Sequence, residues 1–412
     1  MSAKMQPSEK GPGPGPGPVP TSWTADAGGL GTDPIPVEPF VSREFYERER
    51  EKIFKRCWLN VGRVEDIPEP GDYFLRELAV CETTLLVVRG KDGVVRAFHN
   101  VCQHRGNHVV WQSRGRCRSA FTCRFHGWSY DTEGKLVGVP DEKNFFTLEK
   151  SERGLHQVST DIWRGFIFVN LAEQHETLSE YLGELGPALA PYPFEEMPEH
   201  YPYQPEIGVN WKVLLDAQQE GYHVPVLHRL SLAPSVASLE GAIYRTHSFQ
   251  GFGPHRRIST PGNPSFKPNP TARLSAKYGA GAMDAFAGES EAAGSEGDVM
   301  HGAFDFYTIF PNFVIAVLYG TYFTYNIWPL AEDRSIWDIR MYYPKPKTAA
   351  DVFANEYGRI GLRDTLIEDG SVHEHVQSGL KSGALESFLF QDEEVACRHA
   401  YQAVMNYVEG RV

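Results

Sequence analysis

The 412-residue sequence has little of what a secreted, membrane-bound or nucleic-acid-binding protein requires. Six cysteines in a chain of this length do not form a disulfide framework, so we expect reduced and mostly buried thiols. The net charge of −13 argues against a nucleic-acid or anionic-membrane partner. The N-terminal residues lack the apolar stretch of a signal peptide. These absences predict a cytoplasmic protein that binds neither nucleic acid nor membranes.

One segment tests the expectation that the chain does not span a membrane. Residues 306–331 carry no charged side chain and are long enough to cross a bilayer. However, they are rich in β-branched and aromatic residues, hold Pro311 and Asn312 near one end, and are interrupted at Tyr319-Gly320. Buried strands joined by a turn therefore fit this segment better than a membrane helix does.

Composition and periodicity divide the chain into three parts. Residues 1–34 are rich in glycine and proline and are predicted to form a disordered tail. Residues 40–165 hold short strand patterns and predict a small all-β domain. Residues 166–412 alternate longer helices with strands and predict a larger second domain, in which the low-complexity segment 278–298 is either a lid or, as we favour, a disordered insertion. No G-x-G-x-x-G motif follows a strand, so a nicotinamide-binding module is not expected.

Within these parts the periodicity predicts individual elements. We expect strands at 73–78, 83–90 and 94–100 and within 304–343. We expect helices at 210–223, 349–381 and 391–410.

Two short segments of the first domain combine cysteine with histidine. CQHRG (102–106) holds Cys102 and His104, and CRFHGW (123–128) holds Cys123 and His126. This set could hold a structural zinc ion, or a [2Fe-2S] cluster with the two cysteines on one iron and the two histidines on the other. A zinc finger usually groups its cysteines as one pair and its histidines as another. Because each loop here offers one of each, the spacing favours the cluster, an acceptor and donor of single electrons.

A second pattern lies in NWKVLLDAQQEGYHVPVLH (210–228), which contains Glu220, His223 and His228. Two histidines and one carboxylate on one face of an iron leave positions open for dioxygen, as in non-haem Fe(II) oxygenases. On a regular helix the two histidines would point apart. Pro225 between them predicts that the helix bends or ends there, so that both rings converge.

The two cysteine–histidine loops and the N-W-K…E-x-x-H-x4-H segment resemble those of Rieske non-haem iron oxygenase α subunits of the ring-hydroxylating dioxygenase type. The resemblance covers most of residues 40–230. It implies an α+β fold, with an all-β Rieske [2Fe-2S] domain followed by a helix-grip catalytic domain of antiparallel sheet and helices. It also implies that Glu220 is not an iron ligand but links His223 to a cluster histidine, with His126 the expected one.

The third iron ligand must come from far along the chain, and two aspartates compete. Asp369 lies in IEDGSVHEHVQSGL (367–380), which resembles the family's E-D-x-x-x-x-E-x-V-Q-x-G segment, and an acid within this helix can face inward. Asp392 opens a helix together with Glu393 and Glu394, where an exposed acidic cluster is the ordinary explanation. We therefore predict His223, His228 and Asp369 as the ligands of a mononuclear Fe(II).

The sequence departs from the family where the usual Glu-Asn pair is replaced by Asp216-Ala217. Gln218 follows, and if it faces the pocket the substrate carries a hydrogen-bonding group. Core packing is the more ordinary role for the residues that we consider as pocket walls, namely Val213, Leu214, Val226, Phe313, Ile315 and Phe323.

Together these features predict the oxygenase component of a multicomponent system that uses O2 to mono- or cis-dihydroxylate an aromatic or related small organic substrate. The alternatives are oxidative demethylation, or action on a quaternary amine, steroid or terpenoid; a pure iron–sulfur electron carrier; and a zinc-stabilised binding protein. No reductase module is visible, so a separate reductase carrying the flavin and using NAD(P)H must supply electrons, with or without a ferredoxin. The resemblance further implies a homotrimer.

Overall fold

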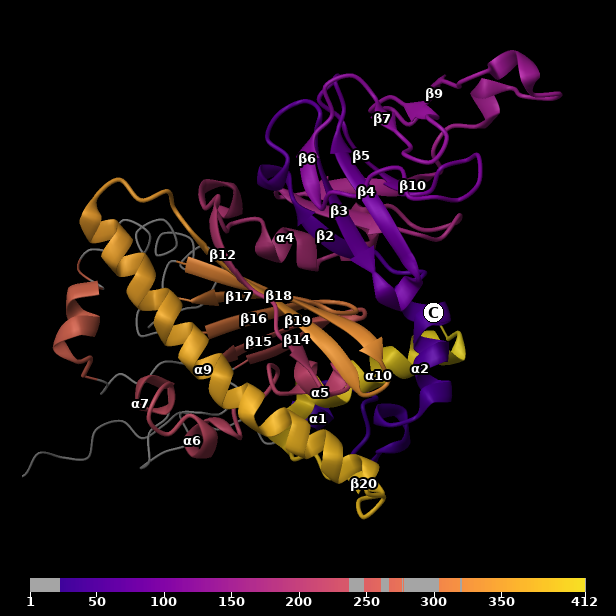
Figure 1. Ribbon diagram of the computed structural model, residues 1–412. Coiled ribbons are helices and arrows are strands. Elements are labelled where there is room, and N and C mark those ends of the chain that lie inside the picture. Colours follow the sequence, from indigo (N-terminus) through magenta and orange to yellow (C-terminus); the bar gives the residue numbers. More distant parts are fainter. Residues whose placement is uncertain are drawn as a thin grey trace, which may run out of the picture.

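The computed structural model describes residues 23–236, 248–260, 267–275, 277, 304–318 and 321–411 (Figure 1). Two lobes, each built on an antiparallel sheet, follow one another along the chain. The segment 278–298, for which we expect a disordered insertion or a lid, lies outside the described residues.

The N-terminal lobe is built on a seven-stranded sheet whose strands run in the order β2-β11-β10-β5-β4-β3-β6. Their bounds are β2 Leu59–Arg63, β3 Asp72–Leu78, β4 Thr83–Arg89, β5 Val95–His99, β6 Arg114–Arg116, β10 Gln157–Trp163 and β11 Phe166–Asn170. The strands predicted at 73–78, 83–90 and 94–100 are thus confirmed. Because β11 pairs with both β2 and β10, this lobe extends to Asn170 rather than ending at residue 165.

A three-stranded sheet, β7 (Phe121–Thr122), β8 (Ser129–Tyr130) and β9 (Leu136–Gly138), lies at the far end of this lobe. It belongs to a small hydrophobic core of its own, which includes Cys102, Cys123 and Tyr130. Both cysteine–histidine loops are therefore anchored in a core separate from the main one.

The C-terminal lobe is built on an eight-stranded sheet in the order β12-β19-β18-β17-β16-β15-β14, with β13 also paired to β19. The bounds are β12 Glu199–Tyr203, β13 Glu206–Ile207, β14 Ser248–Phe252, β15 His255–Thr260, β16 Phe304–Ile309, β17 Phe313–Leu318, β18 Thr321–Ala331 and β19 Arg334–Tyr343. Within the uncharged stretch 306–331, the described residues form most of β16 and all of β17 and β18 in the middle of this sheet, as buried strands. Among the helices of the described residues, none combines the length and the apolar character that a bilayer crossing needs.

Helices cover the second sheet. The long helix α9 (Ala349–Lys381) crosses the sheet, and α10 (Val395–Glu409) lies towards the N-terminal segment (Figure 1). Both helices were predicted from the sequence. Further α-helices are α1 Trp23–Asp26, α2 Arg43–Glu49, α3 Leu178–Leu182, α4 Leu185–Leu189, α5 Trp211–Asp216, α6 Val224–Leu227 and α7 Ala233–Val236. A two-stranded pair, β1 (Ile35–Pro36) with β20 (Ser387–Phe388), joins the N-terminal segment to the connection between α9 and α10.

The structure differs from the helix predicted over 210–223. Helix α5 ends at Asp216, and the chain turns through Gly221 before α6 begins at Val224. The carboxylate of Glu220 accepts the backbone N–H groups of Tyr222 and His223, which takes them away from the helical hydrogen-bond ladder. The break therefore comes before Pro225 and has a different cause from the one expected.

The structure also differs from the expected disordered tail over 1–34. Residues 1–22 lie outside the described part, but from Trp23 onward the chain is held against α10 and the segment before it. The carboxylate of Asp392 accepts the backbone N–H groups of Trp23 (2.7 Å) and Thr24 (2.9 Å), and Arg398 donates to the carbonyl of Asp33 (2.9 Å). These long-range hydrogen bonds order residues that composition alone assigned to the tail.

Candidate metal centres

The two cysteine–histidine loops have the same backbone construction. In the first, the carbonyl of Asn107 accepts the N–H of Cys102, and the N–H of Gly106 donates to the carbonyl of Cys102. In the second, Trp128, Cys123 and Gly127 repeat both hydrogen bonds with matching distances of 2.8 and 2.9 Å. Gly106 and Gly127 have φ values of 77° and 76°, which favour glycine. Each loop is thus a closed turn that fixes its cysteine by the same pair of backbone hydrogen bonds, although the histidine follows two residues after Cys102 and three residues after Cys123.

The two loops face one another so that like residues meet. The rings of His104 and His126 lie 4.5 Å apart, and the thiol of Cys102 interacts with that of Cys123. The hydroxyl of Tyr130 lies 3.4 Å from the sulfur of Cys102, and the amide of Asn107 lies 3.6 Å from the sulfur of Cys123. Nδ1 of His104 is buried and has no hydrogen-bond partner, as expected of a nitrogen that faces a metal.

This set fits two irons better than one zinc ion. A single tetrahedral ion needs its ligand atoms close together. Among the described residues, one group of three or more candidate ligands has its atoms within 4.8 Å of one another, and that group is not the cysteine–histidine set. A cluster of two irons separates the cysteine end from the histidine end, which is the arrangement of these loops. The donor set therefore fits a [2Fe-2S] cluster.

That compact group consists of His223, His228 and Asp369. Nε2 of His228 lies 2.9 Å from Oδ1 of Asp369, and Nε2 of His223 lies 3.7 Å from the same oxygen. The two histidines stand at either end of α6, so this single helical turn brings both rings to one side. Asp369 points inward from α9 and its side chain is buried. The aspartate that competed with it, Asp392, binds the N-terminal segment instead.

Carboxylates orient both histidines of this triad. Oε1 of Glu220 binds Nδ1 of His223, and Oε2 of Glu368 lies 2.8 Å from Nδ1 of His228. Because each Nδ1 is occupied, each Nε2 is left to face Asp369. Burial works to lower the pKa of His228, but the carboxylates of Asp369 and Glu368 outweigh it and raise the pKa.

Oδ1 of Asp369 is buried and accepts no hydrogen bond, although two imidazole nitrogens lie near it. An unsatisfied buried carboxylate oxygen is costly in a metal-free site, whereas a divalent cation would compensate it. Two neutral imidazoles and one carboxylate form a suitable donor set for a mononuclear iron.

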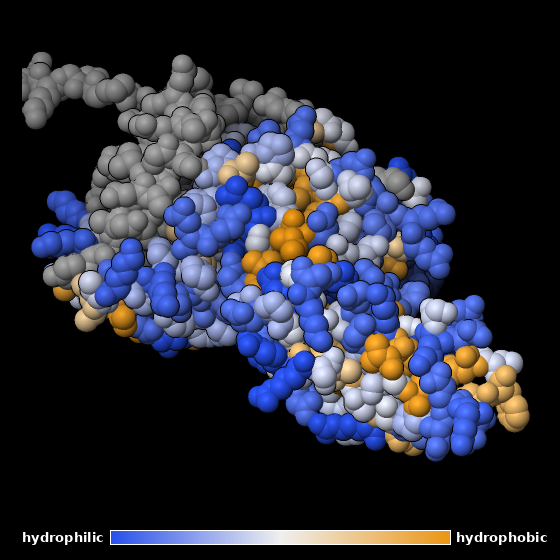
Figure 2. Space-filling model, turned by 90° about the horizontal axis from the view of Figure 1, so that it is seen from above, coloured by the Kyte–Doolittle hydropathy of each residue, from blue (hydrophilic) through white to orange (hydrophobic). Residues whose placement is uncertain are grey.

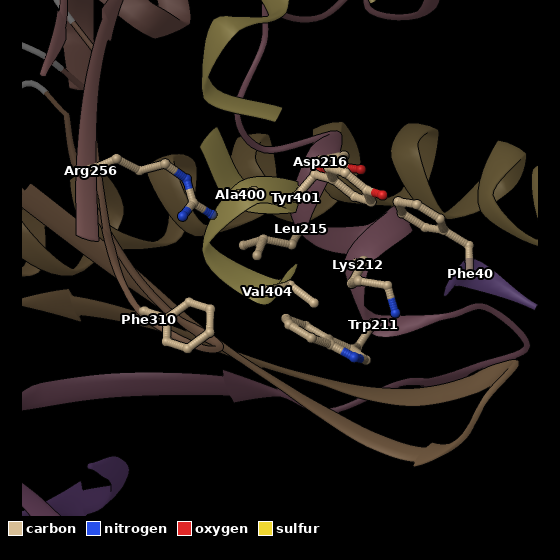
Figure 3. A pocket seen from close by; sticks show the side chains of 10 residues that line it. All are labelled: Phe40, Trp211, Lys212, Leu215, Asp216, Arg256, Phe310, Ala400, Tyr401 and Val404. Atoms are coloured by element: carbon tan, nitrogen blue, oxygen red, sulfur yellow. The ribbon is translucent and has the colours of Figure 1, made fainter. Parts of the chain in front are cut away.

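Behind α5, a cavity of about 10 Å³ provides room for about one water molecule (Figure 3). Burial raises the pKa of Asp216 on its wall to about 8, against the opposing charges of Arg256 and Lys212. Burial also lowers the pKa of Arg256 to about 10, and two guanidinium nitrogens of this residue lack partners. Gln219 binds the third nitrogen, Nε. The segment between α5 and the triad therefore packs on a buried network of polar and ionisable side chains.

The structure locates several of the residues that the sequence suggested as pocket walls or substrate contacts. Gln218 is buried, and its amide nitrogen has no partner. Phe313 packs against Phe166 and Phe168 in the main core, and Val226 is 82% exposed, so neither fits a pocket wall. Glu368 was missed, although it directly precedes Asp369 in the sequence, because nothing in the chain order indicates that it meets His228.

Comparisons with known proteins identify the class of the chain. The family model "Ring hydroxylating alpha subunit (catalytic domain)" matches residues 194–410, more than half of the chain, and "Rieske [2Fe-2S] domain" matches residues 57–156. The chain therefore belongs to the Rieske non-haem iron oxygenase α subunits, a family of oxidoreductases.

Among curated relatives, the 2-aminobenzenesulfonate 2,3-dioxygenase subunit alpha of Alcaligenes sp is 35% identical over 184 residues, which cover 44% of this chain and 46% of that one. The chain spans about half, or less, of the length of the curated relatives it matches.

Solved structures confirm the fold. Naphthalene 1,2-dioxygenase from Rhodococcus sp. bound to indole aligns with a TM-score of 0.73 at 21% identity, covering 91% of this chain and 94% of that one. A quaternary ammonium Rieske monooxygenase, whose structure addresses carnitine oxidation by gut microbiota, aligns with a TM-score of 0.71 at 20% identity, covering 92% and 94%. The expected Rieske β domain and α+β catalytic domain are thus confirmed.

Proposed function

We propose that this chain is the oxygenase component of a multicomponent Rieske system, using O2 to hydroxylate a small organic substrate. A Rieske cluster passes on single electrons, and an iron(II) with two histidine ligands and one carboxylate ligand supplies open positions at which dioxygen is activated. The residues assigned to the cluster are Cys102, His104, Cys123 and His126, and those assigned to the iron are His223, His228 and Asp369.

The observation that carries this proposal is the bare Oδ1 of Asp369 between two histidines whose outer nitrogens are already bound. Glu220 fixes the ring orientation of His223, and Glu368 does the same for His228. Both carboxylates keep a proton on Nδ1, which leaves Nε2 of each ring as a ligand atom. The chain thus holds three ligand atoms in place and leaves the rest of the coordination sphere free.

The arrangement of the two sites supports an electron path between neighbouring subunits. Within one chain, α6 and β7 lie at opposite ends of the molecule (Figure 1). Glu220 forms hydrogen bonds to Tyr222 and His223, and none of its bonds within the chain reaches a cluster histidine. The aligned quaternary ammonium monooxygenase is described by its inter-subunit electron transfer. We therefore propose a homotrimer in which Glu220 accepts a hydrogen bond from His126 of a neighbouring copy.

Co-expression of two inactive variants tests this path. Cys123→Ser removes the cluster and His223→Ala removes an iron ligand, so each homo-oligomer should be inactive. Mixed oligomers should regain activity, because an intact cluster can then face an intact iron site. Activity that stays at background in mixed oligomers of confirmed composition would contradict the path between subunits.

The reaction and substrate are proposed at the level of class. We propose mono- or cis-dihydroxylation of an aromatic or related compound, because the matched relatives include an aromatic dioxygenase subunit. Oxidative demethylation, or attack on a quaternary amine, steroid or terpenoid, is the second candidate, favoured by the similarity to the carnitine-oxidising structure. The partner is a flavin reductase using NAD(P)H, with or without a ferredoxin. All six cysteines are free and buried, which supports a cytoplasmic site of action.

Turnover with a surrogate reductase against a panel of aromatic acids, neutral aromatics, terpenoids, steroids and quaternary amines tests the reaction, with products measured by mass. A gain of two oxygens and two hydrogens indicates cis-dihydroxylation, a gain of one oxygen indicates monohydroxylation, and loss of a methyl group indicates demethylation. Purified protein that contains zinc and no acid-labile sulfide would overturn the proposal.

A further inference from the structure

One buried side chain beside the triad has no partner for either of its polar atoms. His373 is 2% exposed, and neither Nδ1 nor Nε2 forms a hydrogen bond. A neutral imidazole carries one donor and one acceptor, and leaving both without a partner in the interior costs free energy. Burial lowers the pKa of His373, Asp369 opposes this and His223 adds to it, so the ring is neutral at pH 7.

Two comparable buried side chains find partners within the chain at both of their polar ends. Gln377 lies one turn further along the same buried face of α9, and its amide bonds the N–H of Asn210 and the carbonyl of Phe40. His255 is also buried, and its two nitrogens bond the carbonyl of Tyr181 and the N–H of Phe310. The two unsatisfied nitrogens of His373 therefore suggest that the partner is a molecule from outside the chain.

His373 adjoins an aromatic wall next to the triad. It follows Asp369 by one turn of α9. Its ring and that of Trp337 on β19 are T-shaped to one another, with their centres 6.0 Å apart. Tyr325 on β18 lies 5.3 Å from Trp337 and close enough to Asp369 for that charge to help raise its pKa. Phe323 continues the wall, 5.1 Å from Tyr325. An apolar ring lying on this wall would be adjacent both to the proposed iron and to His373.

We propose that His373 is a specificity-determining residue that binds the hydroxyl group of an aromatic substrate lying against Trp337 and Tyr325. This inference rests on the proposed function. A hydroxyl group both donates and accepts a hydrogen bond, which matches the one donor and one acceptor of a neutral imidazole. A carboxylate would instead meet the negative charge of Asp369, which already acts on His373. A quaternary ammonium group has no N–H to offer the ring.

The test measures binding to the iron-loaded oxygenase without reductant, by isothermal titration calorimetry. The probes are three matched pairs: phenol and toluene, 2-naphthol and 2-methylnaphthalene, and 2-hydroxybiphenyl and 2-methylbiphenyl. The native protein should bind the hydroxylated member of at least one pair roughly fivefold to tenfold more tightly, the size of one net hydrogen bond. His373→Leu should remove this preference and leave the affinity for the methyl compound unchanged, whereas His373→Gln should retain part of it.

A matched control is His399→Leu. This half-buried histidine on α10 also has an unpartnered Nδ1, but it packs on Phe249 of β14, so its removal should leave the preference intact. Absence of any preference in the native protein, or the same preference in His373→Leu, overturns the inference and leaves an internal water or a plain unsatisfied histidine in its place. Because binding is measured without turnover, a lost preference in a protein that oxidises no panel compound would sustain the role of His373 while contradicting the oxygenase proposal.

Discussion

The two candidate metal centres hold their ligands by different means. Backbone hydrogen bonds within each short turn position the cluster residues, and the surroundings are open: Trp111 and Phe125 are each 56% exposed. The N-terminal lobe accordingly displays hydrophobic residues on its surface, at the lower right of Figure 2. The triad, in contrast, is held by side chains from separate elements, and His228 and Asp369 are almost fully buried.

This difference matches the chemistry that each centre would perform. A relay must come close to its electron donor and acceptor, so a rigid turn near the surface suits it. A centre that activates dioxygen must keep water away and hold its ligands without filling the coordination sphere, which buried carboxylates achieve. The comparison also predicts that damage to one centre leaves the other intact, since their ligands belong to different hydrophobic cores or elements.

The sharpest test of that independence compares His223→Ala with Cys123→Ser, and it has the largest expected effect. His223→Ala should reduce product formation to background while the visible absorption of the cluster and its iron and sulfide content remain those of the native protein. Cys123→Ser should lose the cluster absorption yet keep the mononuclear iron. If the native protein forms no product, and both it and His223→Ala transfer electrons to an external acceptor equally well, the chain is an electron carrier instead.

A smaller effect is expected from Glu368→Gln, which probes how the buried centre orients its ligands. The amide cannot act as a charged acceptor for Nδ1–H of His228, so the ring should lose its fixed orientation and the affinity for iron should fall about 10- to 100-fold. Iron affinity is measured by competition with a chelator in anaerobic buffer.

The control for this measurement is Glu356→Gln on the same helix, where the carboxylate pairs with Arg359. Its iron affinity should equal that of the native protein. Equal affinity in Glu368→Gln would show instead that α6 alone sets the orientation of His228.

The same contrast explains what could be predicted from the sequence. The cluster loops are contiguous, so their residue order carries both the candidate ligands and the glycines that close the turns. His223 and His228 were singled out for the same reason, although the end of the helix before them was not predicted, since it depends on hydrogen bonds from the backbone of Tyr222 and His223 to the Glu220 side chain. Asp369 required a motif resemblance to separate it from Asp392.

Other features depend on contacts that no local pattern records. Glu368 meets His228 140 positions away in the chain, and the pairing becomes evident only when α9 packs beside α6. His373 reads in the sequence as one more polar residue of a helix. Its significance comes from burial and from two nitrogens without partners. Trp23 and Thr24 likewise lie in a Gly/Pro-rich segment by composition, but their backbone N–H groups are bound by Asp392.

The smallest predicted effect concerns the two matching turns of the cluster. Gly106→Ala should cost about 1 kcal/mol, since a Cβ meets nothing within 4 Å there and only the positive φ is unfavourable. Gly127→Ala should cost about 2 kcal/mol, because its Cβ would also lie 2.9 Å from Cγ of Pro140. The costs are measured from the urea concentration at which cluster absorption is lost. Gly361→Ala, in an open position within α9, is the control and should not lower that midpoint, because alanine favours a helix interior more than glycine does. Equal costs in the two turns would mean that Pro140 moves aside at little cost. Backbone conformation alone would then set the cost in these loops, whereas side-chain contacts hold the buried triad.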